Sequence, residues 1–221
     1  MKLAVFGASG STGVELVKQA LAQGHDVTAL VRDPDKMAGL VPNKDLKIEK
    51  IDLSSADTVE PHLQEKDAVI SCLGSYALFG SVTLYTDSME VIVTAMRKNN
   101  VKRLVCITSW YTTDTPLDPA PFLIRWVINP LFLGRVLTNM AQMEEFLQGC
   151  EDIDFTVVRP PMLTTGSVTD MEFNTEEGQQ VHDRGGMRGM RHADVARFML
   201  SILSSEEWMR KCVAVIAVPR K

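Results

Sequence analysis

Cysteine and aromatic residues are scarce in this chain of 221 residues: it has four cysteines, and aromatic side chains make up 6% of it. No two cysteines have the spacing of a zinc-binding or redox-active Cys-x-x-Cys motif. Scattered thiols of this kind are typical of a reducing compartment, so we expect a cytoplasmic protein. The four histidines are isolated along the sequence, and we therefore expect no metal site.

The chain lacks a large excess of either positive or negative charge, and it also lacks a long uninterrupted apolar run. The formal net charge is −5, which gives no reason to expect a nucleic-acid partner. The strongly apolar stretch 121–137 is interrupted by Arg125, Asn129, Pro130 and Gly134, so it predicts no membrane span. The first predicted strand follows Lys2 directly, so we expect no signal peptide. We also expect a monomer.

Short apolar runs alternate with helical patterns along the whole chain. The runs that predict strands are 3–6, 27–31, 46–51, 68–72, 104–108, 155–159 and 213–218. The patterns that predict helices are 11–23, 33–40, 56–64, 82–98, 135–148 and 193–204. This alternation predicts the α/β class: one domain over residues 1–221 with a doubly wound, parallel Rossmann sheet.

Two long segments, 110–135 and 164–190, depart from the alternation. Long loops in compact domains are often functional, and loops after parallel strands meet at the carboxyl edge of the sheet. We therefore expect both to be substrate-side loops. The apolar part 121–133 is consistent with a lid or with a surface for a protein partner.

The sequence "GASGSTG" at positions 7–13 directly follows the first apolar run. Gly7 permits a tight reversal, Gly10 lets the backbone approach a pyrophosphate, and Gly13 lets helix and strand pack closely. The helix that starts at Ser11 and Thr12 would then direct free N–H groups at phosphates. The alternative is a glycine turn that binds no ligand.

The second predicted strand ends in "ALVRD", with Arg32 where NAD-binding proteins usually have a carboxylate. An arginine there suits the 2′-phosphate of NADP(H). The alternative is a surface ion pair between Arg32 and Asp33 or Asp35. Two later strand ends add candidates: Asp52 for the adenine edge and Gly74 for the nicotinamide half, although both also suit ordinary strand ends or turns.

The catalytic pair of ketone-reducing short-chain dehydrogenases, Tyr-x-x-x-Lys, is missing. None of the three tyrosines, Tyr76, Tyr85 and Tyr111, is followed four positions later by lysine. Ser109 remains at the end of the fifth strand, as a substrate donor or as a backbone cap. Trp110 and Tyr111 either stack on a flat substrate or anchor the loop. An acceptor such as a flavin or tetrapyrrole, which needs no strong acid, fits this site.

The motifs "KLAVFGASGSTG", "VTALVRD", "DAVISCLGS", "CITSW", "VVRPP" and "HADVARFML" resemble, in this order, those of the biliverdin reductase B / flavin reductase (NADPH) family. This family groups with the atypical short-chain dehydrogenases and is related to NmrA-like NAD(P)-binding proteins. The resemblance covers nearly the whole chain and is weakest at 111–135 and 164–187. The Thr-Ser and Pro-Pro motifs are more particular than the glycine turn.

The resemblance implies a set of cofactor contacts. For the pyrophosphate and ribose they are Gly7, Ser9, Gly10, Ser11, Thr12 and Gly13. For the remaining parts they are Arg32 at the 2′-phosphate, Asp52 and Leu53 at adenine, Leu73 and Gly74 at the inner half, and Thr108 next to the nicotinamide. Pro160 and Pro161 match the family's turn after the sixth strand and complete the set of cofactor contacts. The resemblance makes Ser109 the catalytic candidate.

Trp110 and Tyr111 are candidate substrate contacts because they follow Ser109, and the resemblance adds the positions of Met162 and Arg188. Met162 stands where the family has a histidine, so no imidazole acid is available at that position. Arg188 lies near an arginine that the family places at the substrate mouth, although a solvated loop arginine is the simpler interpretation. His192, at the start of the last predicted helix, is interpreted as a local hydrogen-bonding group.

The function predicted by residues and resemblance together is an NADPH-dependent reductase that transfers hydride to a flavin, with linear tetrapyrroles of the biliverdin type as a second acceptor class. Its partner is then a small planar redox substrate. The alternatives are an NmrA-like NADP(H) sensor without turnover and a reductase of quinones or double bonds.

Overall fold

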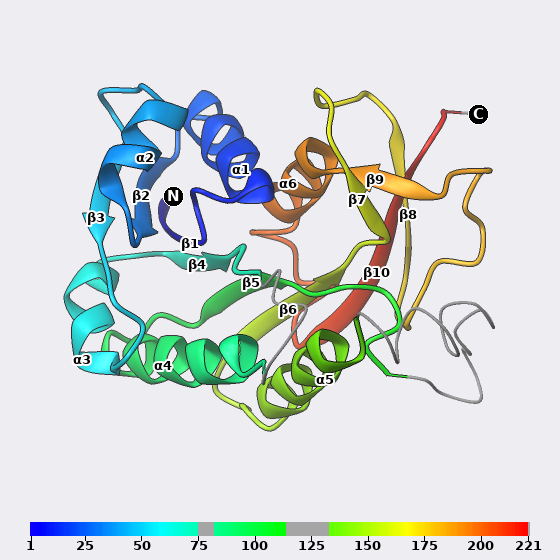
Figure 1. The fold of residues 1–221 in the computed structure, drawn as a ribbon. Coiled ribbons are helices and arrows are strands. Elements are labelled where there is room, and N and C mark those ends of the chain that lie inside the picture. Colours follow the sequence, from blue (N-terminus) through cyan, green and yellow to red (C-terminus); the bar gives the residue numbers. More distant parts are fainter. Residues whose placement is uncertain (75–81, 114–132, 221) are drawn as a thin grey trace.

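The computed structural model describes residues 1–74, 82–113 and 133–220 of the chain. Its main sheet has eight strands in the order β3-β2-β1-β4-β5-β6-β10-β8, as Figure 1 shows. These strands are β1 (Lys2–Phe6), β2 (Asp26–Val31), β3 (Lys47–Lys50), β4 (Ala68–Ser71), β5 (Arg103–Ile107), β6 (Asp154–Arg159), β8 (Glu172–Glu176) and β10 (Lys211–Val218). All neighbours pair in parallel except β8 and β10, which are antiparallel.

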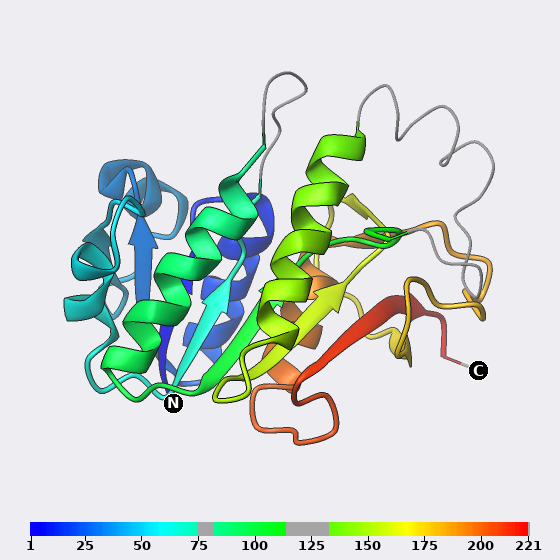
Figure 2. The ribbon, with the colours of Figure 1, turned by 90° about the horizontal axis from the view of Figure 1, so that it is seen from below.

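Helices cover both faces of this sheet (Figure 2). One layer contains α1 (Ser11–Ala22), α2 (Pro34–Leu40) and α6 (His192–Ser201). The other contains α3 (Ala56–Val59), the 3-10 segment η1 (Glu60–Leu63), α4 (Leu84–Lys98) and α5 (Gly134–Gln148). Both layers form because the central strands carry apolar side chains on both faces of the sheet, as β1 illustrates. Leu3 and Val5 belong to the core beneath α1 and α6, whereas Ala4 and Phe6 belong to the core beneath α4 and α5.

The predicted α/β class and doubly wound parallel sheet are confirmed. The elements that the sequence patterns predicted are present in the predicted order, with bounds that agree to within a few residues, but the third helix changes type along its length. There the expected helix 56–64 changes to 3-10 geometry at Glu60, and Pro61 follows without the N–H group that an α-helix would use.

The segment 164–190 contains structure that the sequence patterns did not indicate. Strand β8 lies inside it and closes the sheet edge next to β10, with Val218 opposite Glu172. A separate two-stranded sheet joins β7 (Met162–Thr164) to β9 (Gly189–Arg191). Strand β8 is largely polar, and β7 and β9 are only three residues long, so none of them has the apolar run by which buried strands are recognised.

Of the other expected loop, 110–135, only 110–113 and 133–135 belong to the described residues. Nearly all of the apolar stretch 121–133, for which a lid and a partner surface were both considered, lies outside them, as does Tyr76. Within the described residues, no helix is both long enough and apolar enough to cross a membrane.

Candidate cofactor and active site

The turn between β1 and α1 needs glycine at two positions for reasons internal to the protein. Gly7 has φ +67°, and a Cβ atom there would lie 2.6 Å from the carbonyl carbon and oxygen of Cys72. A Cβ atom on Gly13 would lie 2.2 Å from the carbonyl oxygen of Gly7. Both side chains are therefore excluded by close backbone packing between β1, the end of β4 and α1.

Gly10 differs from these two glycines. It is exposed, it has an ordinary extended φ of −81°, and a Cβ atom there would meet only the Gly7 carbonyl oxygen, at 3.3 Å. Packing alone demands glycine here much less strongly than at Gly7 or Gly13. What its missing side chain does provide is a bare backbone surface at the N-terminal end of α1.

Among the described residues no side chain caps the N-terminus of α1, and the first turn of this helix contains no acidic residue. The first N–H groups of a helix have no partner within the helix, and the helix dipole places positive potential there. Ser11 is exposed and Thr12 is buried in this first turn. The arrangement is suited to binding a phosphate or another anion.

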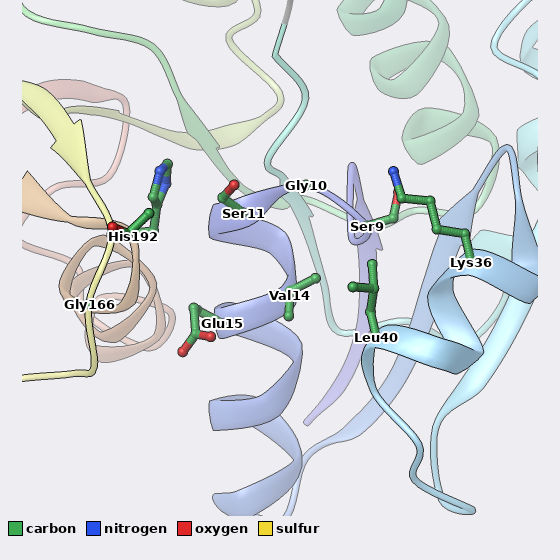
Figure 3. A pocket seen from close by; sticks show the side chains of 10 residues that line it. Ser9, Gly10, Ser11, Val14, Glu15, Lys36, Leu40, Gly166 and His192 are labelled. Atoms are coloured by element: carbon green, nitrogen blue, oxygen red, sulfur yellow. The ribbon is translucent and has the colours of Figure 1, made fainter.

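A cavity of about 300 Å³ lies over this turn. Its lining residues come from the turn and α1 (Ser9, Gly10, Ser11, Val14, Glu15), from α2 (Lys36, Leu40) and from the start of α6 with the segment after β7 (Thr165, Gly166, His192). Figure 3 shows Lys36 and His192 on opposite sides of the α1 N-terminus. Two nitrogen-bearing side chains therefore flank the place where α1 directs its free N–H groups.

Arg32 directly follows β2 and is exposed. Asp33, which the sequence offered as a surface partner, instead caps α2 by accepting a hydrogen bond from the Lys36 N–H at 3.0 Å. In the part of the chain that the structure describes, Arg32 forms no ion pair, either with Asp33 or with Asp35. Its guanidinium is therefore available to a ligand beside α2.

The residues expected to contact the adenine and the inner half of the cofactor lie at the ends of β3 and β4. Asp52 is exposed and its carboxylate accepts a hydrogen bond from the Ser54 N–H at 3.0 Å, so it also stabilises its own turn. Leu53 and Leu73 are half-buried against the core beneath α4, and Gly74 is exposed. This places all four at the same carboxyl edge as the glycine turn.

Ser109 lies at the carboxyl end of β5 and is half-buried. Its hydroxyl has no hydrogen-bond partner among the residues that the structure describes. The neighbouring Thr108 is buried, and its hydroxyl donates to Glu144 Oε1 at 2.7 Å. Of the two hydroxyls in the Thr-Ser motif, that of Thr108 is bound within the protein, whereas that of Ser109 is unbound as far as the described part of the chain goes.

Glu144, on α5, is the centre of a buried polar network that includes Thr108, the residue before Ser109. Its carboxylate also accepts hydrogen bonds from Arg159 Nη2 at 2.5 Å, from Arg159 Nε at 3.1 Å and from the Thr112 hydroxyl at 2.9 Å. Arg159 Nη1 donates to the carbonyl oxygen of Gly178 at 2.8 Å. The network joins α5, the ends of β5 and β6, and the loop that follows β8.

Trp110 and Tyr111 are buried, with 5% and 7% of their surface exposed. Their rings meet edge to face at 6.1 Å and pack with Val181 against β10. The Tyr111 hydroxyl donates to Gln180 Oε1 at 2.6 Å, and the guanidinium of Arg184 lies 4.8 Å from the Trp110 ring centre. In this arrangement the two rings hold the segment after Ser109 in place, which is the anchoring role considered above.

After β6, Pro160 and Pro161 are buried, and the Pro160 carbonyl accepts a hydrogen bond from the Trp110 N–H at 3.0 Å. This contact joins the ends of β5 and β6. Met162 is 70% exposed, and Arg188 is exposed in the segment before β9. Both therefore remain open to a ligand at this edge.

Sequence reasoning missed three contributors to the site: Lys36, the role of His192 in the cavity, and the pair Glu144–Arg159. Lys36 had a usable signal, because it stands four positions after Arg32 at the start of a helix. His192 was interpreted as a local hydrogen-bonding group, but its partner is the distant Thr12. Within the described residues, no cluster of His, Cys, Asp or Glu could hold a metal ion.

Comparison with known proteins agrees with this geometry. A family model described as NAD(P)H-binding matches residues 7–206. The uncharacterized protein YwnB of Bacillus subtilis (strain 168) is 30% identical over 173 residues, which cover 72% of this chain and 71% of YwnB.

Two solved structures share the fold along nearly their whole length. ChuY, an anaerobillin reductase from Escherichia coli O157:H7, has a TM-score of 0.78 and 19% identity, with 100% of this chain and 99% of ChuY covered. SP1627, a candidate NADH-flavin reductase from Streptococcus pneumoniae TIGR4, has a TM-score of 0.77 and 20% identity, with 98% and 99% covered.

The described residues fit a dinucleotide cofactor. Gly10 leaves the backbone of the turn without a side chain, and within the described residues the start of α1 has no side-chain cap. The cationic side chains Lys36 on α2 and Arg32 after β2 lie beside the turn. The match to the family model extends over most of the chain. This protein therefore belongs to the NAD(P)H-binding family of Rossmann-fold proteins, and NAD(P)H is its cofactor.

Proposed function

We propose that this protein is an NADPH-dependent reductase of planar, conjugated acceptors, with flavins as the first acceptor class and linear tetrapyrroles of the biliverdin type as the second. The observation that carries the proposal is the Ser109 hydroxyl, which has no hydrogen-bond partner among the described residues and lies at the same carboxyl edge as the glycine turn. The NADPH is bound at Gly7, Ser9, Gly10, Ser11, Thr12 and Gly13, with Leu73, Gly74, Thr108, Pro160 and Pro161 beside its inner half.

The preference for NADPH over NADH comes from charge around the adenosine ribose. Arg32 and Lys36 are both exposed cations at the start of α2, and Ser9 lines the cavity next to Lys36. A ribose 2′-phosphate in their reach is stabilised by charge-assisted hydrogen bonds, which the 2′-hydroxyl of NADH cannot form with equal strength. Asp52 and Leu53 then border the adenine.

NADPH, when bound, supplies a hydride. The protein binds the cofactor and the acceptor face to face, and Ser109 donates a hydrogen bond that orients the acceptor. The hydrogen bond from Thr108 to Glu144 fixes the residue before Ser109, and the packing of Trp110 and Tyr111 fixes the segment after it. Met162 and Arg188 border the acceptor at the open side. Positioning supplies most of the rate enhancement, because a conjugated acceptor spreads its charge and takes its proton from water.

The descriptions of two structural neighbours support this acceptor class: ChuY is an anaerobillin reductase, and SP1627 is a candidate NADH-flavin reductase. Both carry the same fold at about one-fifth identity. Neither description names a ketone or alcohol, which agrees with the absence of a Tyr-x-x-x-Lys motif from this chain.

The test is turnover by the purified protein with NADPH and FMN, FAD, biliverdin or a quinone, followed by the near-ultraviolet absorbance of reduced nicotinamide. We expect oxidation with at least one flavin. Ser109→Ala should lower kcat about tenfold and leave the Kd for NADPH unchanged, because the hydroxyl meets the acceptor and not the cofactor phosphates. Ser204→Ala, an exposed serine after α6, is the matched control and should behave as wild type.

Two outcomes would overturn the proposal. Oxidation of NADPH with the quinone alone would make the protein a quinone reductase. Tight NADPH binding without turnover of any acceptor would favour the NmrA-like sensor, and recovery of a protein partner would then support it.

A further inference from the structure

We propose that His192 is a phosphate-binding residue of the cofactor site, by which the start of α6 takes part in holding the diphosphate at the start of α1. The inference rests on NAD(P)H as the cofactor and is independent of which acceptor is reduced. It assigns a ligand role to a residue that lies 180 positions from the glycine turn in the sequence.

The position of the His192 ring is fixed relative to α1. Its Nδ1 atom lies 2.8 Å from the Thr12 hydroxyl oxygen, and the next residue, Ala193, accepts a hydrogen bond from Gln19 Nε2 at 2.8 Å. These two contacts join α6 to the first and third turns of α1. The ring therefore stays at the edge of the cavity next to Ser11, as Figure 3 shows.

Two helix N-termini meet at this edge. Helix α6 begins at His192 itself, and its N-cap residue, Arg191, provides no side-chain cap. The acid in its first turn, Asp194, is buried and turned to other partners, since it accepts hydrogen bonds from the N–H and hydroxyl of Thr169 at 2.8 and 3.0 Å. The positive ends of α1 and α6 consequently remain uncompensated by a capping side chain, which favours an anion between them.

The charged groups around the His192 imidazole influence how readily it becomes protonated when such an anion binds. From α1 it faces Glu15, whose carboxylate favours the protonated ring, and across the cavity it faces Lys36 of α2. The guanidinium of Arg191 is bound to the Ser167 carbonyl oxygen at 2.9 Å, and Thr165 and Gly166 are uncharged. Burial is the largest influence and lowers the pKa of His192 below its ordinary value.

A bound diphosphate changes this balance. It offers a negative charge to the ring, so it raises the imidazole pKa relative to the free protein. The protonated ring has two N–H donors, of which Nδ1 can serve Thr12 while Nε2 serves a phosphate oxygen. Affinity for the cofactor should therefore increase as the pH falls through the interval between the two pKa values, with uptake of a proton on binding.

Calorimetric titration of NADP⁺ into wild type and His192→Gln tests this, at several values between about pH 6 and pH 8.5 and in two buffers of different ionisation enthalpy. We expect the variant to bind about tenfold more weakly at about pH 6 and within about twofold at pH 8.5. The 2′-phosphate of NADP⁺ also titrates in this range, so the quantity compared is the difference between the two proteins. The proton uptake of wild type should exceed that of the variant.

His182→Gln is the matched control, because His182 is an exposed histidine whose Nδ1 lies 2.7 Å from Glu176 on β8. His182→Gln should bind NADP⁺ with the same affinity and the same pH dependence as wild type. Thermal unfolding without cofactor checks that His192→Gln is folded. Equal affinities of wild type and His192→Gln at every pH would overturn the proposal. An equal loss at both ends of the pH range would also overturn it, since the ring would then only support Thr12.

Discussion

Arg159 at the end of β6 and Glu144 on α5 form a buried ion pair, with Nη2 and Oε2 2.5 Å apart and both side chains at least nine-tenths buried. The carboxylate accepts further hydrogen bonds from Thr108 and Thr112, so its oxygens are satisfied. Buried charges are tolerated when they are paired and hydrogen-bonded in this way. The pair thereby connects the ends of the two strands that border Ser109.

Glu144→Gln should lower the free energy of unfolding by about 3 kcal/mol, because it removes the buried carboxylate charge that pairs with the Arg159 guanidinium and accepts two hydrogen bonds from it. Urea denaturation measures this. Glu145→Gln provides the matched control, since Glu145 is the exposed neighbour on the same helix and should change stability by about 0.5 kcal/mol or less. A Glu144→Gln protein as stable as the control would show that the ion pair does not stabilise the strand ends.

Arg32→Glu should raise the KM for NADPH by about thirtyfold or more and change the KM for NADH by about threefold or less. The guanidinium has no ion-pair partner among the described residues, so its removal costs a ligand contact and little stability. Steady-state kinetics with both cofactors measure the two constants. Lys102→Glu makes the same charge change at an exposed residue just before β5, at the opposite edge of the sheet, and should affect neither. Equal effects of Arg32→Glu on both cofactors would refute the assignment of Arg32 to the 2′-phosphate.

The glycines of the turn should separate into two classes. Gly13→Ala should destabilise the fold by several kcal/mol, on the order of 3, because its Cβ would overlap the Gly7 carbonyl oxygen at 2.2 Å. The free energy of unfolding of Gly10→Ala should lie within about 1 kcal/mol of the wild-type value. The same variant should nevertheless bind NADP⁺ at least about tenfold more weakly. Thermal unfolding and calorimetry distinguish the two effects. Gly39→Ala on α2, where a Cβ meets open space, should alter neither property adversely. If Gly10→Ala bound the cofactor normally, the bare backbone at that position would have no role in binding.

The fold was predictable because each central strand is buried on both faces. Such strands read as short apolar runs, and the helices between them carry an apolar stripe that repeats with helical periodicity. The sequence patterns missed strands whose residues are only partly buried. Strand β8 is an edge strand with polar residues such as Glu172 and Glu176, and its pairing with β10 brings together segments about forty residues apart.

The candidate site was predictable where a single local motif carries the chemistry. The glycine turn and Arg32 both lie in one β-α-β unit, so their order in the sequence also gives their order in space. The buried positions of Trp110 and Tyr111 could not be predicted in this way. Whether a ring after a strand faces a ligand or the core depends on what packs against it, here Val181 and β10.

The amino-acid sequence by itself determined the alternation of strands and helices, the backbone turn that faces the cofactor and the absence of a Tyr-x-x-x-Lys pair. These properties are local, since they follow from side-chain periodicity, from backbone conformation at glycine and from residue identity. Only the tertiary structure decided that Glu144 accepts a hydrogen bond from Thr108 and that His192 lies beside Thr12. Such contacts arise when helices that are distant in the chain pack on the same sheet, and side-chain spacing along the sequence carries no record of that packing.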